Sequence, residues 1–368
     1  MNTKKLSIIF ACRWNAEMEK TWSGTAYAIY KEFQKRFHVE RFDIKDTRKV
    51  KLFKIFRKLH LVKGDPSLLS VIQTYNHKFE KIGEKGQIIF QFDETPWNTN
   101  TINYIYQDLS VAYIRYMKQN EPVAYSYSGF SGIKDIELQK REELQQKYYT
   151  HCKGIFTMGQ WLADFMVSNC GIPKDKIHVV GAGINVPIAA TDYSKKSGNK
   201  ILFVGKDFER KGGKLVIEAF KILREKYRKA AELYIAGPED KMSCMDEDGI
   251  IFLGNLSKEK VAEYFEICDI FCMPSYFEAF GIVFCEALAS GLPCIARRKY
   301  AMKEIIEDGE DGYLIDDDDA QILAQKMNML LLDNKITQNV RKKRETYIQK
   351  YSWERIAGEM EKVILNNY

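Results

Sequence analysis

Two glutamates, Glu278 and Glu286, stand eight positions apart in the sequence, with Gly281 between them. Glu278 is expected in a loop and Glu286 inside the helix that follows, and because eight residues span just over two helical turns, both carboxylates can face the same side of the helix entrance. A carboxylate accepts two O–H hydrogen bonds from a vicinal diol, as the acidic residue of dinucleotide-binding folds does with ribose. The pair is therefore suited to holding the hydroxyl groups of a ribose and of a second sugar. Taken singly, each glutamate is more typical of a solvated helix surface.

The segment around these glutamates is predicted to form a strand, a tight loop and a helix. The apolar run 270–273 ends at Pro274 and Ser275, which suit the exit from a strand. Apolar residues then return at helical spacing until Gly291 closes the helix. Gly281, just before that helix, lets a ligand approach the backbone N–H groups at its positive end, where phosphate is favoured. A phosphate, a ribose and a second polyol together describe a nucleotide sugar.

A second loop has the composition of an anion site. Residues 206–213 follow an apolar strand predicted at 201–205 and precede another predicted helix. The loop contains Lys206, Arg210 and Lys211 together with two glycines. Cations and glycines in a strand-to-helix loop bind anions through charge and through backbone access. A lone lysine in a loop is usually solvated, so the prediction depends on the whole loop, which would complete the phosphate site.

These motifs resemble those of the retaining glycosyltransferases of family 4. Residues 271–296 resemble the family's Glu-x7-Glu signature and the helix end and strand that follow it, and residues 304–306 and 308–314 match its next turn. The resemblance covers the C-terminal half closely and the N-terminal half loosely. It implies the α/β GT-B fold, in which two Rossmann-like, doubly wound domains face a crevice and a C-terminal helix crosses back to the first domain.

The length of the chain agrees with two domains, because 368 residues exceed one typical core. We expect an acceptor-binding domain at residues 1–186, a nucleotide-sugar-binding domain at 187–350 and the returning helix at 351–368. The polar stretch 192–199 has the character of a linker.

The same resemblance assigns roles to individual residues. It implies catalytic roles for Glu278, Lys211 and Asp108, and donor contacts for Gly24, Gly205, Lys206, Arg210, Lys211, Gly237, Glu278, Phe280, Gly281, Ile282, Val283 and Glu286. Glu286 would hold the ribose diol and Glu278 the transferred sugar. Lys206, Lys211 and the N–H groups at the start of the following helix would stabilise the departing diphosphate, which would make a metal ion unnecessary.

Strand ends in the N-terminal half supply candidate acceptor contacts. The predicted strands 88–92 and 104–106 are followed by Asp93, Glu94, Gln107 and Asp108. Because strand carboxyl ends line the ligand crevice of an open parallel sheet, these side chains are placed to meet the acceptor. Many members of the resembled family carry a histidine at such a strand end. Asp108 would take its place and orient the acceptor hydroxyl or the donor sugar; alternatively, Asp108 caps the next helix.

Gly24 lies between a strand predicted at 6–11 and a helix predicted at 26–36. Ser23 or Thr25 could cap this helix, and Gly24 would permit close approach to its N-terminus. The resembled family often has two glycines here that touch the donor phosphate and the acceptor, whereas this chain has one. Gly24 is therefore either a donor contact or a turn glycine before an amphipathic helix.

Residues 45–63, KDTRKVKLFKIFRKLHLVK, are unusual in composition. Apolar residues recur at helical spacing while lysines and arginines occupy the other faces. Such a basic amphipathic helix or hairpin can lie in an anionic membrane surface, where each cation is worth roughly 1 kcal/mol. Alternatively, the apolar stripe packs against the domain and the basic face is solvated.

The bulk composition bounds the function classes. With 45% hydrophobic and 29% charged residues the chain is that of a folded protein. A net charge of +6 suits anionic ligands or a membrane surface and does not require nucleic acid. Five histidines leave little for a metal site, and eight cysteines without a C-x-x-C pair favour a reduced, cytoplasmic compartment. The apolar run 6–12 is too short for a signal peptide core, and no stretch approaches transmembrane length.

The sequence therefore predicts a retaining, metal-independent glycosyltransferase, in the first place a hexosyltransferase. The enzyme would need no bound cofactor. Its donor substrate would be a nucleotide sugar, in the first place a UDP-sugar. A glycan, lipid-linked or protein acceptor is expected, in cell-surface polysaccharide or glycolipid biosynthesis, with the enzyme cytoplasmic or peripheral to the cytoplasmic face of a membrane. The alternative is a non-catalytic glycosyltransferase-like subunit that docks a partner or a membrane through residues 45–63, although both glutamates and the Lys-Gly-Gly loop are intact. A nicotinamide-dependent dehydrogenase would require G-x-G-x-x-G after a first strand, which neither candidate strand offers.

Overall fold

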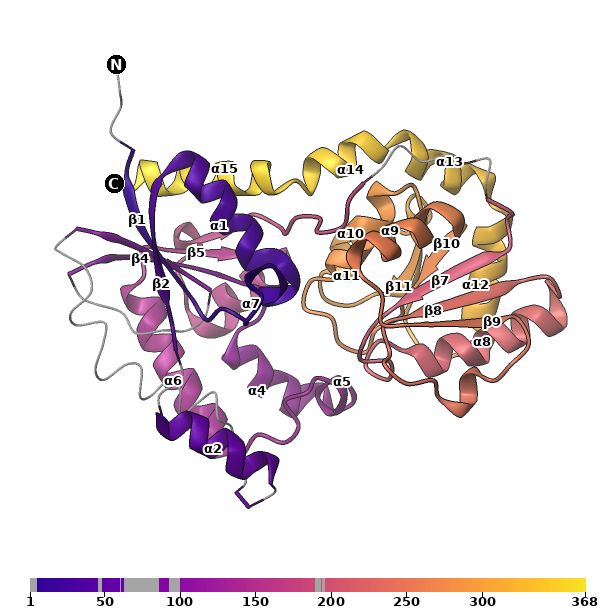
Figure 1. Ribbon diagram of the computed structural model, residues 1–368, viewed down its shortest axis with the longest axis horizontal. Helices are drawn as coiled ribbons and strands as arrows, with labels where there is room; N and C mark the ends of the chain where they lie inside the picture. The colour runs from indigo at the N-terminus through magenta and orange to yellow at the C-terminus, as the bar shows by residue number, and fades with distance from the viewer. Residues whose placement is uncertain are drawn as a thin grey trace. The chain divides into compact units, whose positions relative to one another are not determined.

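The computed structural model of the protein contains two compact units (Figure 1). Unit 1 comprises Met1–Ala182 and Trp353–Tyr368, and unit 2 comprises Gly183–Ser352. The structure describes residues 5–45, 48–59, 61–62, 86–92, 100–188, 193 and 196–368. Among the helices in these ranges, none combines the length and the apolar character that crossing a bilayer requires.

Unit 1 is built on a parallel sheet with the strand order β2-β1-β3-β4-β5-β6. Its strands are β1 (Ser7–Cys12), β2 (His38–Asp43), β3 (Ile88–Gln91), β4 (Ile102–Gln107), β5 (Gly154–Thr157) and β6 (Ile177–Val179). The central strands are short apolar runs, as expected where helices cover both faces of a sheet, and in β1 every residue after Ser7 is buried. The edge strand β2 is largely exposed and carries no apolar run, which explains why it is not predicted from the sequence.

Helices surround this first sheet. They are α1 (Thr25–Arg36), α2 (Arg48–Lys58), α4 (Val111–Asn120), α5 (Pro122–Tyr127), α6 (Asp135–His151), α7 (Gln160–Cys170) and α15 (Trp353–Asn366). The C-terminal helix α15 packs on α1, where an Arg36 Nη2 donates to the Glu354 carbonyl oxygen at 2.9 Å. Arg355 in the same helix donates to the Val180 carbonyl oxygen, also at 2.9 Å. These contacts make the last helix part of unit 1.

Unit 2 repeats the architecture with the strand order β12-β11-β10-β7-β8-β9, again parallel throughout. Its strands are β7 (Lys200–Val204), β8 (Glu232–Ala236), β9 (Ile250–Gly254), β10 (Ile270–Cys272), β11 (Cys294–Arg297) and β12 (Gly312–Ile315). Its helices are α8 (Gly213–Lys226), α9 (Lys258–Ile267), α10 (Ile282–Ala289), α11 (Met302–Ile305), α12 (Ala320–Leu332), α13 (Asn334–Lys342) and α14 (Arg344–Lys350). Helices cover both faces of each sheet (Figure 1), and α8 and α12 pack against each other. The predicted class, α/β with two doubly wound sheets, is confirmed.

Each sheet contains one point where the strand order reverses. In unit 2 the chain passes from β7 to β8 on one side and later from β10 to β11 on the other, while β7 and β10 are neighbours. In unit 1 the same relation holds for β1 and β3. At such a point the loops after the two strands leave in opposite directions and open a crevice at the carboxyl edge of the sheet.

One detail of the sequence prediction is confirmed and another is wrong. Because α10 begins at Ile282, Glu278 lies in the loop before it and Glu286 lies in the helix, as predicted. Neither Ser23 nor Thr25 caps α1; its N-cap is Gly24, and the helix has no side-chain cap. The chain enters α1 through a left-handed turn, whereas a residue whose side chain caps a helix usually has an extended backbone.

Candidate functional site

The loops that follow β7 and β10 meet at the reversal point of the second sheet. Each leads into a helix whose N-cap is a glycine, Gly212 for α8 and Gly281 for α10, and neither helix is capped by a side chain. By contrast, Ser257 caps α9 and Asp319 caps α12, because their side chains accept hydrogen bonds from backbone N–H groups of the first turn. The two helix N-termini at the reversal point therefore lack the usual internal acceptor and suit an anion.

An ion pair between Lys211 and Glu278 joins the two loops. Lys211 Nζ donates to Glu278 Oε2, and the two side chains are only 12% and 14% exposed. Burial lowers the pKa of the Lys211 ammonium group, and the neighbouring Glu278 carboxylate opposes that shift. Each charge compensates for the desolvation of the other, since an isolated charge at this depth would be costly.

Arg210 reinforces the same junction. One of its Nη atoms donates to the Phe277 carbonyl oxygen at 2.7 Å and lies 3.5 Å from Glu278 Oε2, and its Nε donates to Asp207 at 2.9 Å. The guanidinium group is thus engaged by protein acceptors in both loops. Its position fits a residue that holds the Glu278 loop in place.

Glycines allow the backbones of these loops to approach one another. A Cβ on Gly212, which has φ +78°, would lie 2.6 Å from the Pro274 carbonyl oxygen. A Cβ on Gly237, with φ +116°, would lie 2.5 Å from the Gly205 carbonyl carbon, and one on Gly205 would lie 2.7 Å from Lys211 Cγ. Of the predicted donor contacts, Gly205 and Gly237 therefore have a geometric reason to be glycine, because they let the loops after β7 and β8 converge beside Lys211.

Arg297 also belongs to this site but is not predicted from the sequence. It is buried at the end of β11, where its Nε donates to the Ser275 carbonyl oxygen at 3.2 Å and an Nη donates to Asp318 at 2.5 Å. Its guanidinium carbon lies 4.7 Å from the ring centroid of Tyr276. These contacts satisfy a buried cation and fix the segment that leads to Glu278. An arginine at the end of an otherwise apolar strand is the signal that could have revealed it.

The predicted contacts at the start of α10 differ in exposure. Phe280 is buried, whereas Ile282 and Val283 are partly exposed. A Cβ on Gly281, which has φ +92°, would lie 3.1 Å from Glu278 Cγ. Gly281 therefore leaves room for the Glu278 side chain beside the helix N-terminus.

Glu286 ties α10 to the segment that opens unit 2. Its side chain is buried, with 7% of the residue exposed, and Oε1 accepts a hydrogen bond from the Asn185 N–H at 2.9 Å. Burial raises the pKa of Glu286, and hydrogen bonds from the backbone of Asn185 and Val186 oppose that shift. A ribose diol at this carboxylate would have to share it with, or displace, the backbone of residue 185.

The turn before α1 carries the predicted residue Gly24. Trp22, Ser23 and Gly24 all have positive φ angles, +49°, +56° and +100°. A left-handed conformation costs roughly 1–2 kcal/mol for each non-glycine residue, so this turn stores strain at the reversal point of the first sheet. Gly24 belongs to unit 1, whereas the other predicted donor contacts belong to unit 2.

Asp108 lines a cavity of about 180 Å³ in unit 1. Its lining includes Trp22, Gln107, Phe130 and Arg141. Asp108 does not cap the next helix, α4. The N-cap of α4 is Ser110, whose side chain accepts a hydrogen bond from the Tyr113 N–H. The cavity thus combines aromatic surface with a carboxylate and a guanidinium group, a lining that suits a polar ring such as a sugar.

The other predicted acceptor contacts are less informative. Gln107 is buried and donates to the Tyr149 hydroxyl at 2.7 Å, which gives it a packing role. Asp93 and Glu94 lie outside the described residues.

The structure brings together most of the predicted donor contacts of unit 2. They are Gly205, Arg210, Lys211, Gly237, Glu278 and Gly281, with the exposed Lys206 in the same loop as Lys211. Within the described ranges, no three His, Cys, Asp or Glu side chains gather as metal ligands would.

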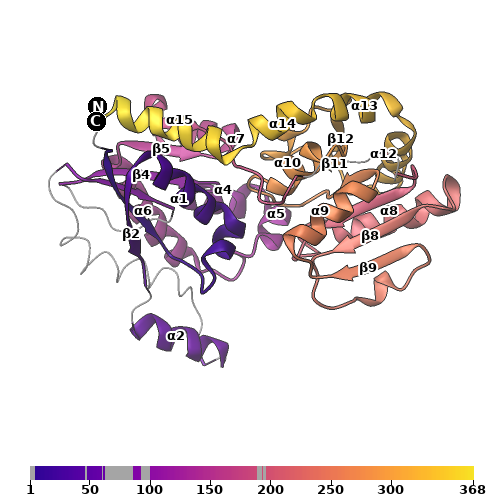
Figure 2. The ribbon, with the colours of Figure 1, turned by 45° about the horizontal axis from the view of Figure 1, so that its top comes forward.

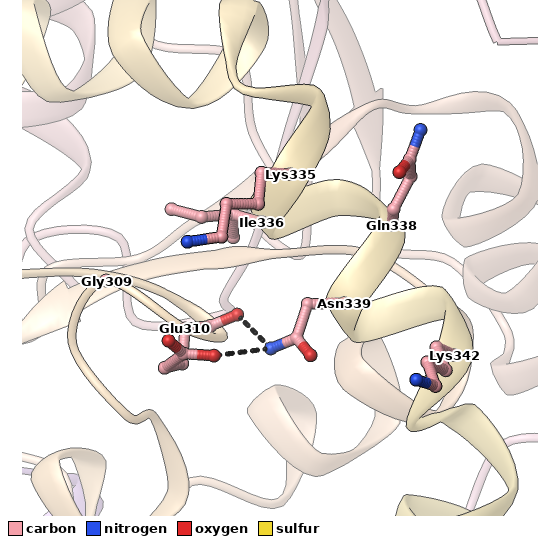
Figure 3. Close-up of a pocket in the computed structure, with 7 residues that line it drawn as sticks. All are labelled: Gly309, Glu310, Lys335, Ile336, Gln338, Asn339 and Lys342. Atoms are coloured by element: carbon pink, nitrogen blue, oxygen red, sulfur yellow. Dashed lines mark hydrogen bonds between the residues drawn. The ribbon is translucent and has the colours of Figure 1, made fainter.

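A separate cavity of about 220 Å³ lies beside α13 (Figure 3). Asn339 Nδ2 donates there to the carbonyl oxygen and the carboxylate of Glu310, at 2.8 and 3.0 Å, and Lys335 and Lys342 line the rim. Gly309 and Glu310 precede β12, so this cavity lies at the amino edge of the sheet. It is lined by none of the catalytic, donor or acceptor residues predicted from the sequence.

Comparison with known proteins first defines the fold. The structure is similar to that of WaaG, a glycosyltransferase involved in lipopolysaccharide biosynthesis, with a TM-score of 0.69, 15% identity, and coverage of 97% of this chain and 99% of that one. It is also similar to Anabaena Alr3699/HepE, solved with UDP and glucose, with a TM-score of 0.64, 14% identity, and coverage of 98% and 100%. The predicted GT-B fold is therefore confirmed.

Sequence comparison concerns mainly the second unit. Residues 190–366, which include most of unit 2 and the helix α15, match the family model "Glycosyl transferases group 1". The chain is 25% identical over 266 residues to a D-inositol 3-phosphate glycosyltransferase of Paenarthrobacter aurescens, which covers 64% of this chain. It spans 65% of the length of that relative and about half of the length of several others.

Proposed function

We propose that the protein is a retaining, metal-independent glycosyltransferase that moves a hexose from a nucleotide sugar to an acceptor hydroxyl. The donor would be a UDP-sugar, and the acceptor a lipid-linked, glycan or protein hydroxyl in glycolipid or cell-surface polysaccharide assembly. The Glycosyl transferases group 1 domain and the GT-B fold support this class. The finer assignments are argued from the site.

The observation that carries the proposal is the Lys211–Glu278 pair at the reversal point of the second sheet. A nucleotide sugar brings an anionic diphosphate, which can replace Glu278 as the partner of Lys211, and sugar hydroxyls, which can replace Lys211 as the donors to Glu278. Both buried groups would thus keep a partner when the substrate binds. A simple anion would satisfy only Lys211, and a simple sugar only Glu278.

The leaving group is the second point of the proposal. As the bond from the sugar C1 to the phosphate oxygen breaks, negative charge develops on the diphosphate. Lys211, the exposed Lys206 and the uncapped N-terminus of α10 are fixed donors for that charge, and such preorganised donors lower a barrier by several kcal/mol. They would do for the diphosphate what a bound metal ion does in other enzymes, and Glu286 would hold the ribose.

Retention of configuration would follow from attack on the same face of the sugar. The acceptor oxygen forms its bond to C1 on the side from which the diphosphate leaves, and the departing phosphate oxygen takes the acceptor proton. Glu278 is then a binding group and not a nucleophile, because its carboxylate accepts hydrogen bonds from the sugar hydroxyls and lies beside the Arg210 guanidinium group. In unit 1, Asp108 would orient the acceptor hydroxyl from the cavity that it lines.

A UDP-sugar is favoured because HepE, which has a similar fold, was solved with UDP and glucose. A lipid-linked or surface-glycan acceptor is favoured by the printed name of WaaG. The eight cysteines are unpaired and six of them are buried, which fits a reducing, cytoplasmic location.

Product analysis tests the stereochemistry and the metal independence together. The enzyme would be incubated with a UDP-hexose and an acceptor extract in the presence of EDTA, and the anomeric proton coupling of the product would be measured by NMR. We expect transfer at an unchanged rate with the α-configuration of the donor preserved. An inverted product, or activity that EDTA abolishes and Mg²⁺ or Mn²⁺ restores, would contradict the proposal.

A further inference from the structure

Helix α2 presents an apolar face to solvent. Its exposed apolar side chains are Leu52, Ile55 and Phe56, at 52%, 55% and 44% exposure, and Leu59 and Leu61 just beyond the helix are 59% and 67% exposed. The Leu59 N–H donates to the Ile55 carbonyl oxygen and so continues the helical turn. At about 100° per residue, Leu52, Ile55, Phe56 and Leu59 fall within an arc of about 100° and form one stripe, which we call the apolar stripe of α2. Val50, on the opposite side of the helix, is buried.

This arrangement is the reverse of the one expected for a helix that packs on its domain by its apolar side. The sequence left two interpretations of residues 45–63 open, a membrane contact and an ordinary packed helix with a solvated basic face. Since the stripe is exposed and the buried residue is Val50, the structure contradicts the second interpretation for the described part of this segment. Figure 2 shows α2 projecting from the sheet of its own unit.

The charges of α2 are arranged around the stripe. Six of its eleven residues, in the sequence RKVKLFKIFRK, are lysine or arginine and none is acidic. Lys49 flanks the stripe on one side, and Lys51 and Lys58 flank it on the other, all three exposed. Their long aliphatic stems can lie along an apolar layer while their ammonium groups remain at a polar boundary.

The combination of an exposed apolar stripe with flanking cations favours one of three possible partners for α2: a second copy of the chain, a groove on another protein, or an anionic bilayer. A second copy of the chain would place cations against cations, with no acidic residue in α2 to compensate for them. A protein groove would have to be apolar at its floor and acidic along both rims. An anionic bilayer provides both features over an unlimited area, with acyl chains beneath the stripe and phosphates at the level of the lysines.

We propose that α2 lies in the interface of an anionic membrane, with its apolar stripe at the boundary of the acyl chains and Lys49, Lys51 and Lys58 at the lipid phosphates. The contact holds the chain as a peripheral protein. Its use, which is to bring the enzyme to a lipid-linked acceptor, rests on the proposed function, whereas the contact itself does not.

Vesicle flotation of the full chain tests the proposal. Binding to vesicles of phosphatidylglycerol mixed with phosphatidylcholine would be compared with binding to phosphatidylcholine alone, at low and high salt. We expect binding to the anionic vesicles that weakens as salt is added. The Leu52→Ser/Phe56→Ser variant should weaken it about 100-fold, at about tenfold per apolar side chain. The Lys49→Gln/Lys51→Gln/Lys58→Gln variant should lose about fivefold per cation.

Matched controls are available elsewhere on the chain. Ile322 and Met329 on α12 are 42% and 48% exposed, so Ile322→Ser/Met329→Ser removes comparable apolar surface. Lys335→Gln/Lys342→Gln removes two cations from the rim of the cavity in Figure 3. Neither control variant should change vesicle binding.

The outcomes separate this proposal from the proposed function. All α2 variants should hydrolyse the donor in the absence of vesicles as the wild type does. Vesicle binding without turnover of any donor would support the membrane contact and overturn the glycosyltransferase. A wild type that stays off anionic vesicles, or stripe variants that bind as the wild type does, would overturn the membrane contact. If the stripe variants instead convert a dimer to a monomer and no vesicle binding is found, a second copy is the occupant.

Discussion

Lys211 and Glu278 form a nearly buried ion pair that bridges the loops after β7 and β10. The two residues are 67 positions apart in the sequence, and the reversal of strand order in the second sheet brings them together. Each group would be costly to bury alone. The pair therefore stabilises the junction of the two loops and, at the same time, prepares a cation and a carboxylate for a ligand that can satisfy both.

A double-mutant cycle should reveal this mutual dependence. Because removal of one partner leaves the other charge buried, Lys211→Met and Glu278→Gln should each lower the free energy of unfolding by about 2–3 kcal/mol, somewhat below the value for a fully buried pair. The double variant Lys211→Met/Glu278→Gln should cost less than the sum of the two single changes. Urea denaturation of the four proteins measures this, and strict additivity would show that the two groups do not depend on each other.

Donor binding should depend on pH through Lys211. Burial holds the pKa of this ammonium group below its ordinary value of 10.5, and a bound diphosphate would raise it again. UDP affinity should therefore fall as the pH rises from neutral towards 10.5, and binding in the alkaline range should take up protons.

Calorimetric titration with UDP in buffers of different ionisation enthalpy measures that proton uptake. Lys211→Arg serves as the control, because a guanidinium group stays charged over this range, so its UDP affinity should vary less with pH. A pH profile that is the same for the wild type and Lys211→Arg would rule out titration of Lys211.

The sequence reveals the two loops at this site but not how their side chains are held. Apolar runs followed by Pro-Ser or by a Lys- and Gly-rich loop predict strand exits, and these predictions are local. The contact of Glu286 with the Asn185 N–H spans 101 positions and depends on tertiary packing, which no periodicity encodes. The role of Arg297 was not predicted for the same reason. Its hydrogen-bond acceptors, on Ser275 and Asp318, belong to segments that are distant in the sequence.

The start of α10 was predictable from the sequence, because apolar residues return at helical spacing directly after Gly281, which leaves Glu278 in the loop and Glu286 in the helix. In the first unit, the positive φ angles of Trp22 and Ser23 could not be foreseen, because neither residue type favours them. The strand order, and with it the convergence of the two loops, follows from the doubly wound α/β class and was therefore predictable.

The Glu286→Gln substitution should change the stability of the protein and its affinity for UDP in opposite directions. The folded-state pKa of Glu286 is raised above its ordinary value of 4.5, so its contribution to stability is fully present below that pH and is lost as the pH rises through the folded-state value. A glutamine keeps an oxygen for the Asn185 N–H and carries no charge. The variant should therefore be more stable than the wild type by about 1–2 kcal/mol above neutral pH, and about equal to it at pH near 4.

Thermal unfolding across this pH range measures the stability difference, and UDP titration measures the cost in affinity. If Glu286 accepts the ribose diol, the glutamine should weaken UDP binding by about tenfold, which corresponds to the loss of one charge-assisted hydrogen bond. An unchanged UDP affinity would make Glu286 a structural residue only.

Gly212→Ala should disturb the site through the backbone. The substitution places a methyl group 2.6 Å from the Pro274 carbonyl oxygen at a φ of +78°, so both strain and a clash with main-chain atoms oppose it. We expect a loss of about 3 kcal/mol or more in stability and weaker UDP binding. Gly171→Ala is the matched control, with φ +65° and no atom within 4 Å, and should cost only about 1–2 kcal/mol without an effect on UDP. Equal losses in the two variants would show that close approach at Gly212 is unimportant.

Arg297 should act as a positioning residue for the loop that carries Glu278. Arg297→Met removes the hydrogen bonds to Ser275 and Asp318 and should weaken UDP binding while the fold is retained. Its neighbour Arg298 is 40% exposed and pairs with Asp308 and Asp316 outside this loop, so Arg298→Met should leave UDP affinity unchanged. Isothermal titration of both variants decides the point. A similar affinity in both would mean that the loop does not depend on Arg297.

The central claim, that the Lys211–Glu278 site binds and activates a nucleotide sugar, is tested most directly by donor hydrolysis. UDP-, GDP- and ADP-sugars would be offered without added metal to the wild type, to Glu278→Ala and Lys211→Ala, and to Lys335→Ala as a control from the cavity at the opposite edge of the sheet. The account predicts turnover of one donor, a UDP-sugar, by the wild type and Lys335→Ala, and its loss in both site variants. Turnover that survives in Glu278→Ala and Lys211→Ala, or the absence of turnover and binding for every donor, would contradict it.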